Sequence, residues 1–205
     1  MASKISTKQL TYWLGKFGDD YIERNSDLAM FRRREQFFKK LLQKYPEIKS
    51  VLEVGSNIGG NLMVFNKIDP KLKIVAVEPN KKAAKIAREN LSSAKILEKS
   101  VFDMDFDDKF DLVFTCGVLI HIADNDLGKA LTKIYNASRK YILTIEYYSN
   151  KRSAIPYRGL SDALFKRPYD KEYLNLYPKL KVMYKGSLDK SKGFDNCKFW
   201  VFKKR

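Results

Sequence analysis

The sequence predicts an α/β protein with a doubly wound, mostly parallel seven-stranded sheet, a C-terminal antiparallel hairpin and an N-terminal helical lid. Three observations support this fold class. Short apolar runs alternate with amphipathic segments between residues 50 and 146, as in strands joined by right-handed helical crossovers. The chain ends in two strand-like runs separated by a polar loop. It begins with segments of helical character rich in aromatic residues.

The N-terminal lid is predicted to begin with a folded segment, Tyr12–Asn25, that is dense in aromatic, glycine and charged residues. Gly15 and Gly18 disfavour one continuous helix there, because glycine weakens helix interiors. Two interpretations remain open. The segment is either a hydrophobic plug over a sheet edge, or a lid whose aromatic side chains and Arg24 close over a ligand.

An amphipathic helix is predicted to follow this segment. Asp27 is a good N-cap, apolar residues recur at helical spacing up to Tyr45, and Pro46 ends the helix. The arginine triplet Arg32–Arg34 within it is expected on a solvent-exposed face.

The core is predicted to contain five strands, at about 50–54, 73–78, 94–98, 110–115 and 141–146. Helices are predicted between them at about 59–67, 81–90 and 125–136, and Asn80 is expected to cap the second of these. After the last core strand comes a turn-rich, basic and aromatic connection, 147–169, and long connections of this kind are usually functional or disordered. A short helix near 170–176 and a hairpin of strands near 181–185 and 198–202 complete the chain.

The first core strand ends in a glycine-bearing turn, within Val51–Leu62. Glycines there let the backbone approach a ligand closely, and the following helix offers free N–H groups, as in nucleotide-type sites. A dinucleotide site requires glycine where Asn57 stands, and the asparagine side chain would crowd a pyrophosphate. Glu53, just before the turn, favours a cationic ammonium and repels phosphates.

Two further acids follow later strands. Glu78 closes the second strand, where it can accept hydrogen bonds from both ribose hydroxyls. Asp103 follows the third strand and is expected to accept from the adenine amino group, with Phe102 or Met104 against the ring. S-Adenosylmethionine has an amino-acid end and no phosphate. Three acids at the carboxyl ends of strands therefore favour it over a dinucleotide.

Five motifs carry a resemblance to a known family: Trp13–Asn25, Leu52–Asn61, Phe114–Ile122, Glu146–Tyr148 and Tyr157–Gly159. Through them the chain resembles class I S-adenosylmethionine-dependent methyltransferases, and more narrowly the small methylases associated with pseudaminic acid biosynthesis. The similarity spans nearly the whole chain and weakens at Asp195–Trp200.

The resemblance implies a Rossmann-like methyltransferase fold that binds S-adenosylmethionine and releases S-adenosylhomocysteine. It also implies a small, anionic acceptor, sugar-like, sugar-nucleotide or amino-acid-derived, in the biosynthesis of cell-surface glycans such as nonulosonic acids or capsule. The expected cofactor-binding residues are Trp13, Phe17, Tyr21, Arg24, Glu53, Gly55, Ser56, Asn57, Gly59, Asn61, Glu78, Pro79, Phe102, Asp103, Met104, Cys116 and Gly117.

The expected reaction is direct displacement at the sulfonium methyl, in which the enzyme aligns the reactants and excludes water. A hydroxyl or ammonium acceptor also needs a base. His121, the only histidine, follows the fourth strand and is either that base, an acceptor ligand, or a structural side chain. Glu146 is a second candidate base or an arginine partner.

Residues around the 147–169 connection are expected to bind the acceptor. Arg158 is the best candidate for a carboxylate or phosphate, because the guanidinium fork matches such groups. For each candidate the alternative is ordinary loop packing or a solvated charge. The candidates are Tyr147, Tyr148, Tyr157, Arg158 and Arg167.

Composition restricts the remaining classes of protein. With 205 residues, 44% apolar and 13% aromatic, one ordered domain is expected over 1–205, divided into 1–46, 50–146 and 147–205. The sequence has no long apolar run and no signal-like N-terminus, which predicts a cytoplasmic chain with no membrane partner. Its two cysteines are far apart, which predicts that they are reduced. No metal is expected, because a single histidine and scattered acids have no ligand spacing.

The formal net charge of +16 leaves several partners open. It favours nucleic acid, an anionic sugar nucleotide or a membrane surface, but the lysines are scattered and no arginine- and aromatic-interleaved tract occurs, so nucleic acid is not the expected partner. An RNA or protein methyltransferase and a non-catalytic S-adenosylmethionine-binding module remain as alternatives.

Overall fold

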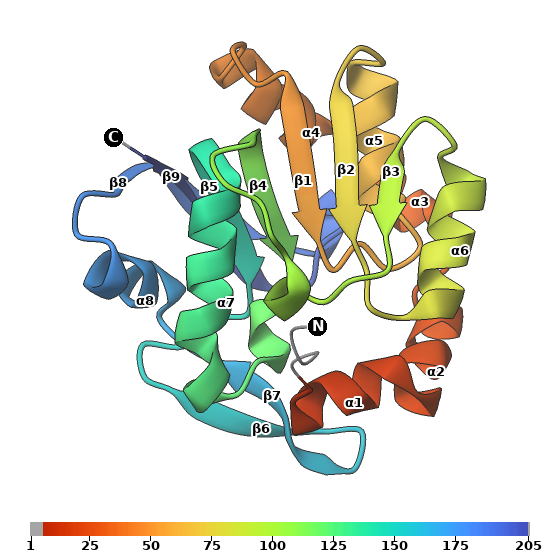
Figure 1. Cartoon of the computed structure of the whole chain (residues 1–205), viewed down its shortest axis with the longest axis vertical. Coiled ribbons are helices and arrows are strands. Elements are labelled where there is room, and N and C mark those ends of the chain that lie inside the picture. The colour runs from red at the N-terminus through yellow and green to blue at the C-terminus, as the bar shows by residue number, and fades with distance from the viewer. Residues whose placement is uncertain (1–5, 205) are drawn as a thin grey trace.

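The computed structural model describes residues 6–204 and contains a seven-stranded sheet in the order β3-β2-β1-β4-β5-β9-β8 (Figure 1). The order and pairing confirm the predicted fold class, a mostly parallel sheet that ends in an antiparallel hairpin. The parallel strands are β1 (Ser50–Val54), β2 (Lys73–Val77), β3 (Lys95–Leu97), β4 (Phe110–Cys116) and β5 (Ser138–Glu146). The antiparallel strands are β8 (Lys181–Leu188) and β9 (Cys197–Lys203).

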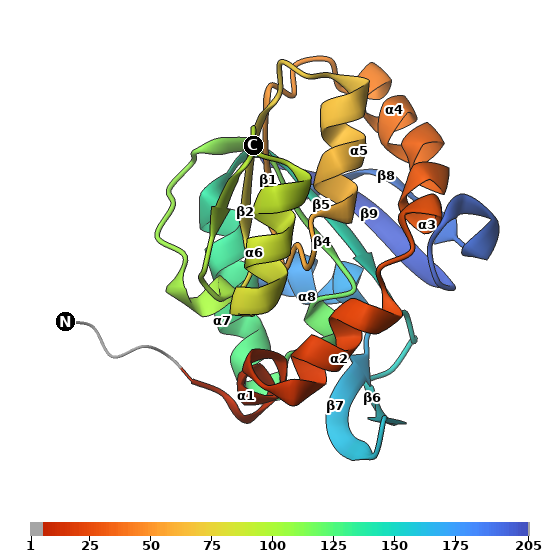
Figure 2. The ribbon, with the colours of Figure 1, turned by 90° about the vertical axis from the view of Figure 1, so that its right-hand side faces the viewer.

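Helices cover both faces of this sheet (Figure 2). Because both faces are buried, the strands have nearly continuous apolar sequences. Side chains still alternate between the two cores: Val51 packs in one, and Leu52 and Val54 pack in the other. One face carries α4 (Glu35–Lys44), α5 (Gly60–Ile68) and α6 (Lys81–Asn90), and the other carries α7 (Asp124–Ala137) and α8 (Tyr169–Leu176).

The first two N-terminal helices lie beyond the carboxyl ends of the parallel strands (Figure 1), and the third lies beside α5 (Figure 2). As expected, the chain does not form one helix there, since Gly15 separates two short helices. The predicted cap at Asp27 is confirmed, because its Oδ1 accepts from the Ala29 N–H at 2.8 Å. The single helix predicted after it is wrong: it breaks at Arg34 into two. The helices of this region are α1 (Lys8–Leu14), α2 (Lys16–Arg24) and α3 (Leu28–Arg33).

A two-stranded hairpin that the sequence did not predict stands in the connection after β5. Its strands are β6 (Ser153–Tyr157) and β7 (Leu160–Lys166). Arg158 and Gly159 form the turn with φ of 52° and 82°, the left-handed backbone that two-residue hairpin turns require. The remaining elements are short 3₁₀ turns, η1 (Val101–Asp103), η2 (Leu119–His121) and η3 (Lys190–Lys192).

Candidate active site

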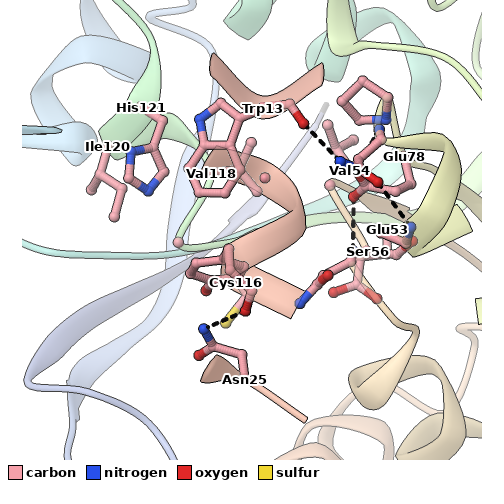
Figure 3. Close-up of a pocket in the computed structure, with 18 of the residues that line it drawn as sticks. Trp13, Asn25, Glu53, Val54, Ser56, Glu78, Cys116, Val118, Ile120 and His121 are labelled. Atoms are coloured by element: carbon pink, nitrogen blue, oxygen red, sulfur yellow. Dashed lines mark hydrogen bonds between the residues drawn. The ribbon is translucent and has the colours of Figure 1, made fainter. Parts of the chain in front are cut away.

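A cavity of about 450 Å³ opens at the carboxyl ends of β1, β2 and β4 (Figure 3). It lies where the strand order reverses, with β2 on one side of β1 and β4 on the other, and open α/β sheets bind their ligands at such a crevice. The lid helices α1 and α2 and the β6–β7 hairpin close it from the opposite side. Residues of β1, β4, the two lid helices and the hairpin line it, together with Glu78 and Pro79, which directly follow β2.

The glycine turn after β1 forms the floor of the cavity. Gly55 and Asn57 both have left-handed backbone, with φ of 75° and 47°. A Cβ on Gly55 would lie 2.6 Å from the Val118 side chain, so only glycine permits this close approach. Gly59 lies outside the cavity lining and is the N-cap of α5, with φ of 80°.

Glu53 places a buried carboxylate at the end of β1, inside the cavity. Its Oε1 accepts from Asn61 Nδ2 at 2.7 Å, whereas its Oε2 is buried without a hydrogen-bond partner among the described residues. Burial raises the pKa of Glu53 to about 8. An acceptor left unpaired at such a place favours a donor supplied by a ligand.

Glu78 directly follows β2, and its carboxylate joins the turn after β1 to the start of α6. Its two oxygens accept from the backbone N–H groups of Asn57 at 2.8 Å and Asn80 at 2.9 Å. Burial raises its pKa to about 7, against the opposing effect of these two hydrogen bonds. Asn80 caps α6 as predicted, since its Oδ1 accepts from the Ala83 N–H.

Two of the three residues expected around adenine after β3, Asp103 and Met104, are not brought to the cavity. The carboxylate of Asp103 accepts from the N–H and the hydroxyl of Ser100, at 3.1 and 2.6 Å, so it closes a local capping box. Met104 is buried in the core. Instead, Ser100 and Val101 line the cavity together with the predicted Phe102.

His121 lines the cavity from the turn after β4 and contacts the lid. Its ring centroid lies 4.5 Å from that of Trp13 (Figure 3) and 5.6 Å from that of Tyr157. Nδ1 lies 2.6 Å from the carbonyl oxygen of Ala163, so Nδ1 carries the hydrogen and Nε2 carries the lone pair. Burial lowers the pKa of His121 to about 4, which keeps the ring neutral near pH 7.

Glu146 does not line the cavity but holds the turn that carries His121. Its carboxylate accepts from the backbone N–H groups of Val118, Leu119 and Ile120, at 3.2 to 3.3 Å. Burial raises its pKa to about 7. Its position is that of a positioning residue rather than of a base in contact with an acceptor.

Three of the expected acceptor residues line the cavity, namely Tyr147, Tyr157 and Arg158. Arg167 does not: it is 1% exposed and donates to Asp124 Oδ1 at 2.7 Å, so it anchors α7. Tyr148 packs instead on Trp200, under the Lys198 ammonium.

The lid contributes Trp13, Tyr21 and Arg24 to the lining. Phe17 packs behind them, with ring centroids 5.2 Å from Trp13 and 5.8 Å from Tyr157. Among the expected residues not yet placed, Ser56, Asn61, Pro79, Cys116 and Gly117 also line the cavity.

Several lining residues were missed by the sequence-based prediction. The most consequential is Arg34, which was assigned to a solvent-exposed face but is 8% exposed and faces the cavity. Nothing local distinguishes it from Arg32 and Arg33, which are exposed. Further lining residues not predicted include Thr7, Leu10, Asn25, Met30, Phe31, Asn80, Phe194, Asp195 and Cys197.

Within residues 6–204 no group of three or more His, Cys, Asp or Glu side chains is placed to hold a metal ion. In the same part of the chain no helix combines the length and the apolar character needed to cross a bilayer.

Comparison with known proteins agrees with this geometry. Residues 51–140 match the family model described as a methyltransferase domain. No curated protein matches the chain in sequence.

Solved structures share the fold at low sequence identity. The 1,6-didemethyltoxoflavin-N1-methyltransferase of Burkholderia thailandensis, with 1,6-didemethyltoxoflavin and S-adenosylhomocysteine bound, is similar with a TM-score of 0.71 at 14% identity, over 100% of this chain and 93% of that one. Magnesium protoporphyrin IX methyltransferase of Synechocystis PCC 6803, with S-adenosylmethionine bound, is similar with a TM-score of 0.71 at 10% identity. The match covers 99% of this chain and 100% of that one. Mitomycin 7-O-methyltransferase is similar with a TM-score of 0.70 at 17% identity, over 96% of this chain and 60% of that one.

Proposed function

We propose that this chain, whose residues 51–140 match the model of a methyltransferase domain, is a class I S-adenosylmethionine-dependent methyltransferase that transfers a methyl group to a small anionic metabolite. The expected acceptors are sugars, sugar nucleotides or amino-acid-derived intermediates of cell-surface glycan biosynthesis, the class implied by the resemblance to pseudaminic acid-associated methylases. The family match and the fold support methyl transfer. The choice of an anionic acceptor is supported by the position of Arg158 in the cavity.

The residues present fit S-adenosylmethionine. Glu53 offers a buried acceptor oxygen that has no hydrogen-bond partner among the described residues. Glu78 also lines the cavity, beside the turn in which position 55 must be glycine. The cavity displays acids where a dinucleotide would place phosphates, which disfavours that class of ligand. When bound, the cofactor supplies a methyl group activated by a positively charged sulfur.

His121 is the proposed base for the acceptor. The hydrogen bond between Nδ1 and the Ala163 carbonyl leaves the Nε2 lone pair available, and burial, which lowers the pKa of His121 to about 4, keeps the ring unprotonated at physiological pH. The Glu146 carboxylate orients the turn that carries the imidazole. The Trp13 ring packs against His121, and the lid to which it belongs excludes water from the site.

The observation that carries the choice of an anionic acceptor is the position of Arg158. This side chain lines the cavity at the tip of the β6–β7 hairpin, and no acidic partner lies within ion-pair distance among the described residues. Arg152, directly before β6, does not line the cavity and pairs with Asp124 at 2.9 Å. An unpaired guanidinium in a ligand cavity favours a carboxylate or phosphate on the ligand.

The experiment compares Arg158→Gln with the matched control Arg152→Gln. Methyl transfer from S-adenosylmethionine is measured on a panel of acidic sugars, sugar nucleotides and N-acylated amino acids. Losing one charge-assisted hydrogen bond costs about 1.5–3 kcal/mol, so we expect Arg158→Gln to raise the acceptor KM roughly 10- to 150-fold. The dissociation constant of S-adenosylhomocysteine should stay within twofold, and Arg152→Gln should match the wild type.

Other outcomes would replace the proposal. Methylation of RNA with salt-sensitive binding, or of protein, in the absence of turnover on the small-molecule panel would assign a macromolecular acceptor. Tight binding of S-adenosylmethionine with no turnover on any acceptor would indicate a non-catalytic module. Equal acceptor KM values in the two arginine variants would remove Arg158 from acceptor binding.

A further inference from the structure

One residue of the β6–β7 hairpin, Asp162, fastens the lid helix α1 to the hairpin (Figure 1). Its carbonyl oxygen accepts from Gln9 Nε2 at 3.1 Å. Its carboxylate accepts from the Tyr12 hydroxyl at 3.2 Å and pairs with the Lys8 ammonium at 2.8 Å. Gln9 is buried, and a buried amide is costly to leave without its partner. These three contacts of Asp162 are called the clasp.

The clasp acts where β7 lacks support from its own partner strand. The register of the hairpin shifts around Pro156, which has no N–H to donate to the ladder, and residues 161–163 have no Cα partner on β6. The carbonyl of Asp162 bonds to the lid instead, and the carbonyl of Ala163 bonds to His121 Nδ1 at 2.6 Å. The position of this part of β7 therefore depends on contacts outside the hairpin.

The backbone of the turn that carries His121 is held by groups that do not belong to the clasp. Glu146 accepts from three of its N–H groups, at 3.2 to 3.3 Å. Arg167 donates to two of its carbonyl oxygens, at 2.9 and 3.5 Å. These contacts fix the backbone of the turn but not the orientation of the imidazole. The only hydrogen-bond partner of the ring among the described residues is the Ala163 carbonyl.

Helix α1 also contacts the imidazole directly. The Trp13 ring lies 4.5 Å from that of His121, measured between ring centroids (Figure 3). A lid that moved away from Asp162 would therefore also withdraw an aromatic ring from the imidazole. The clasp and the stacking act together, but only the hydrogen bond to Ala163 selects which ring nitrogen carries the hydrogen.

We propose that Asp162 is a positioning residue: through the clasp it holds the Ala163 carbonyl against Nδ1 of His121, so that a docked lid leaves the lone pair on Nε2. The inference rests on the proposed function, in which His121 is the base. It adds a residue that does not itself line the cavity. Docking of the lid and orientation of the imidazole become one event, because adjacent residues of β7 make both contacts.

The test measures the tautomer of the imidazole by nuclear magnetic resonance of its nitrogens, in isotopically labelled protein saturated with S-adenosylhomocysteine at pH 7. His121 is the only histidine in the sequence, so its ring signals need no further assignment. Nitrogen chemical shifts distinguish the atom that carries the hydrogen from the atom that carries the lone pair. Burial lowers the pKa of His121 to about 4, so only the two neutral tautomers compete at this pH.

In the wild type we expect the tautomer with the hydrogen on Nδ1. Asp162→Ala should lower the ratio of this tautomer to the other at least about fivefold, as expected for the loss of one hydrogen bond. Asp162→Asn keeps an oxygen that can accept from Tyr12, so it should bring the ratio back toward the wild-type value. Gln9→Ala weakens the clasp from the side of the lid and should change the ratio in the same direction as Asp162→Ala.

Asp20→Ala is the matched control in the same lid. Asp20 pairs with Lys16 inside α2, at 2.9 Å, so its loss should leave the tautomer ratio unchanged. If the ratio stays at the wild-type value in both Asp162→Ala and Gln9→Ala, the clasp has a structural role only and the inference is refuted. The same conclusion follows if Asp20→Ala changes the ratio as much as Asp162→Ala does.

The outcomes separate this inference from the proposed function. If the ratio responds as expected but no acceptor on the panel is methylated, the clasp stands and the proposed function fails. If His121→Ala abolishes methyl transfer while the ratio responds to neither Asp162→Ala nor Gln9→Ala, the proposed function stands and the clasp is refuted.

Discussion

The contact between the lid and α6 can be tested at one glycine. Gly18 lies in α2, packed against the end of α1 and against the cap of α6. A Cβ at this position would lie 2.1 Å from the Trp13 carbonyl oxygen and 2.9 Å from Asn80 Nδ2, well inside van der Waals contact. Gly18→Ala must therefore push the lid away from α6.

The cost follows from the hydrogen bonds that this displacement breaks. Asn80 Nδ2 donates to the Trp13 carbonyl at 3.0 Å and to Asp19 Oδ1 at 2.9 Å. A neutral hydrogen bond is worth about 1 kcal/mol and one to a charged group about 1.5–3 kcal/mol. Losing both costs about 2.5–4 kcal/mol, and we expect the lower end because Asp19 is half-buried. If ligand binding requires the docked lid, affinity falls by about 70-fold.

Gly15→Ala provides a matched control in the same lid. The nearest atom to a Cβ at this position, the Thr11 carbonyl oxygen, lies at an ordinary distance of 3.5 Å. Calorimetry with S-adenosylhomocysteine should show a dissociation constant raised at least tenfold for Gly18→Ala and unchanged for Gly15→Ala. Equal affinities of the two variants would show that the contact with α6 does not hold the lid over the cavity.

Two further predictions concern the proposed base and the sheet. His121→Ala should lower kcat about 100-fold or more while S-adenosylhomocysteine affinity stays within a few fold. Because the pKa of His121 is lowered to about 4, the wild-type rate should show no histidine titration between pH 6 and 7. Unchanged turnover in the variant would remove His121 from the mechanism. Asp111→Asn should lower the free energy of unfolding by about 3 kcal/mol, since the buried carboxylate accepts hydrogen bonds from Lys49, Ser50 and Arg139. As a control, Asp108→Asn at an exposed ion pair should change this free energy by less than about 1 kcal/mol. The pKa of Asp111 is lowered in the folded state. Its contribution to stability is therefore present above the pKa of the unfolded state and is lost as pH falls through the pKa of the folded state. Denaturant titrations that show equal stability loss in both variants, or no acid dependence, would contradict this.

Element types could be predicted from local pattern because periodicity and capping act over a few residues. The strand over Ser50–Val54 and the helix over Lys81–Asn90 have the predicted bounds. The β6–β7 hairpin was missed although Arg158-Gly159 supplies its turn. Pro156 obscured the pattern, because it coincides with a bulge in the ladder rather than with the end of a strand.

Site residues could be predicted where the fold places them by topology. Glu53 lies near the carboxyl end of β1 and Glu78 directly follows β2, the neighbouring parallel strand, so both had to lie at one edge of the sheet. Asp103 and Arg167 were assigned by residue type, and each has a partner of its own, Ser100 and Asp124, that keeps it out of the cavity. Residue type alone does not show whether a charge already has a partner.

The sequence by itself determined the order of the core strands and of the helices between them, the turn after β1 and the acids at the strand ends, because each depends on neighbouring residues and on the rules of parallel sheets. Only the tertiary structure decided which arginine of the triplet is buried. Arg34 is selected by the Gly193 carbonyl, 159 residues away, and by Asn61 across the cavity. Such contacts leave no periodic trace in the chain, since they arise where separate elements meet.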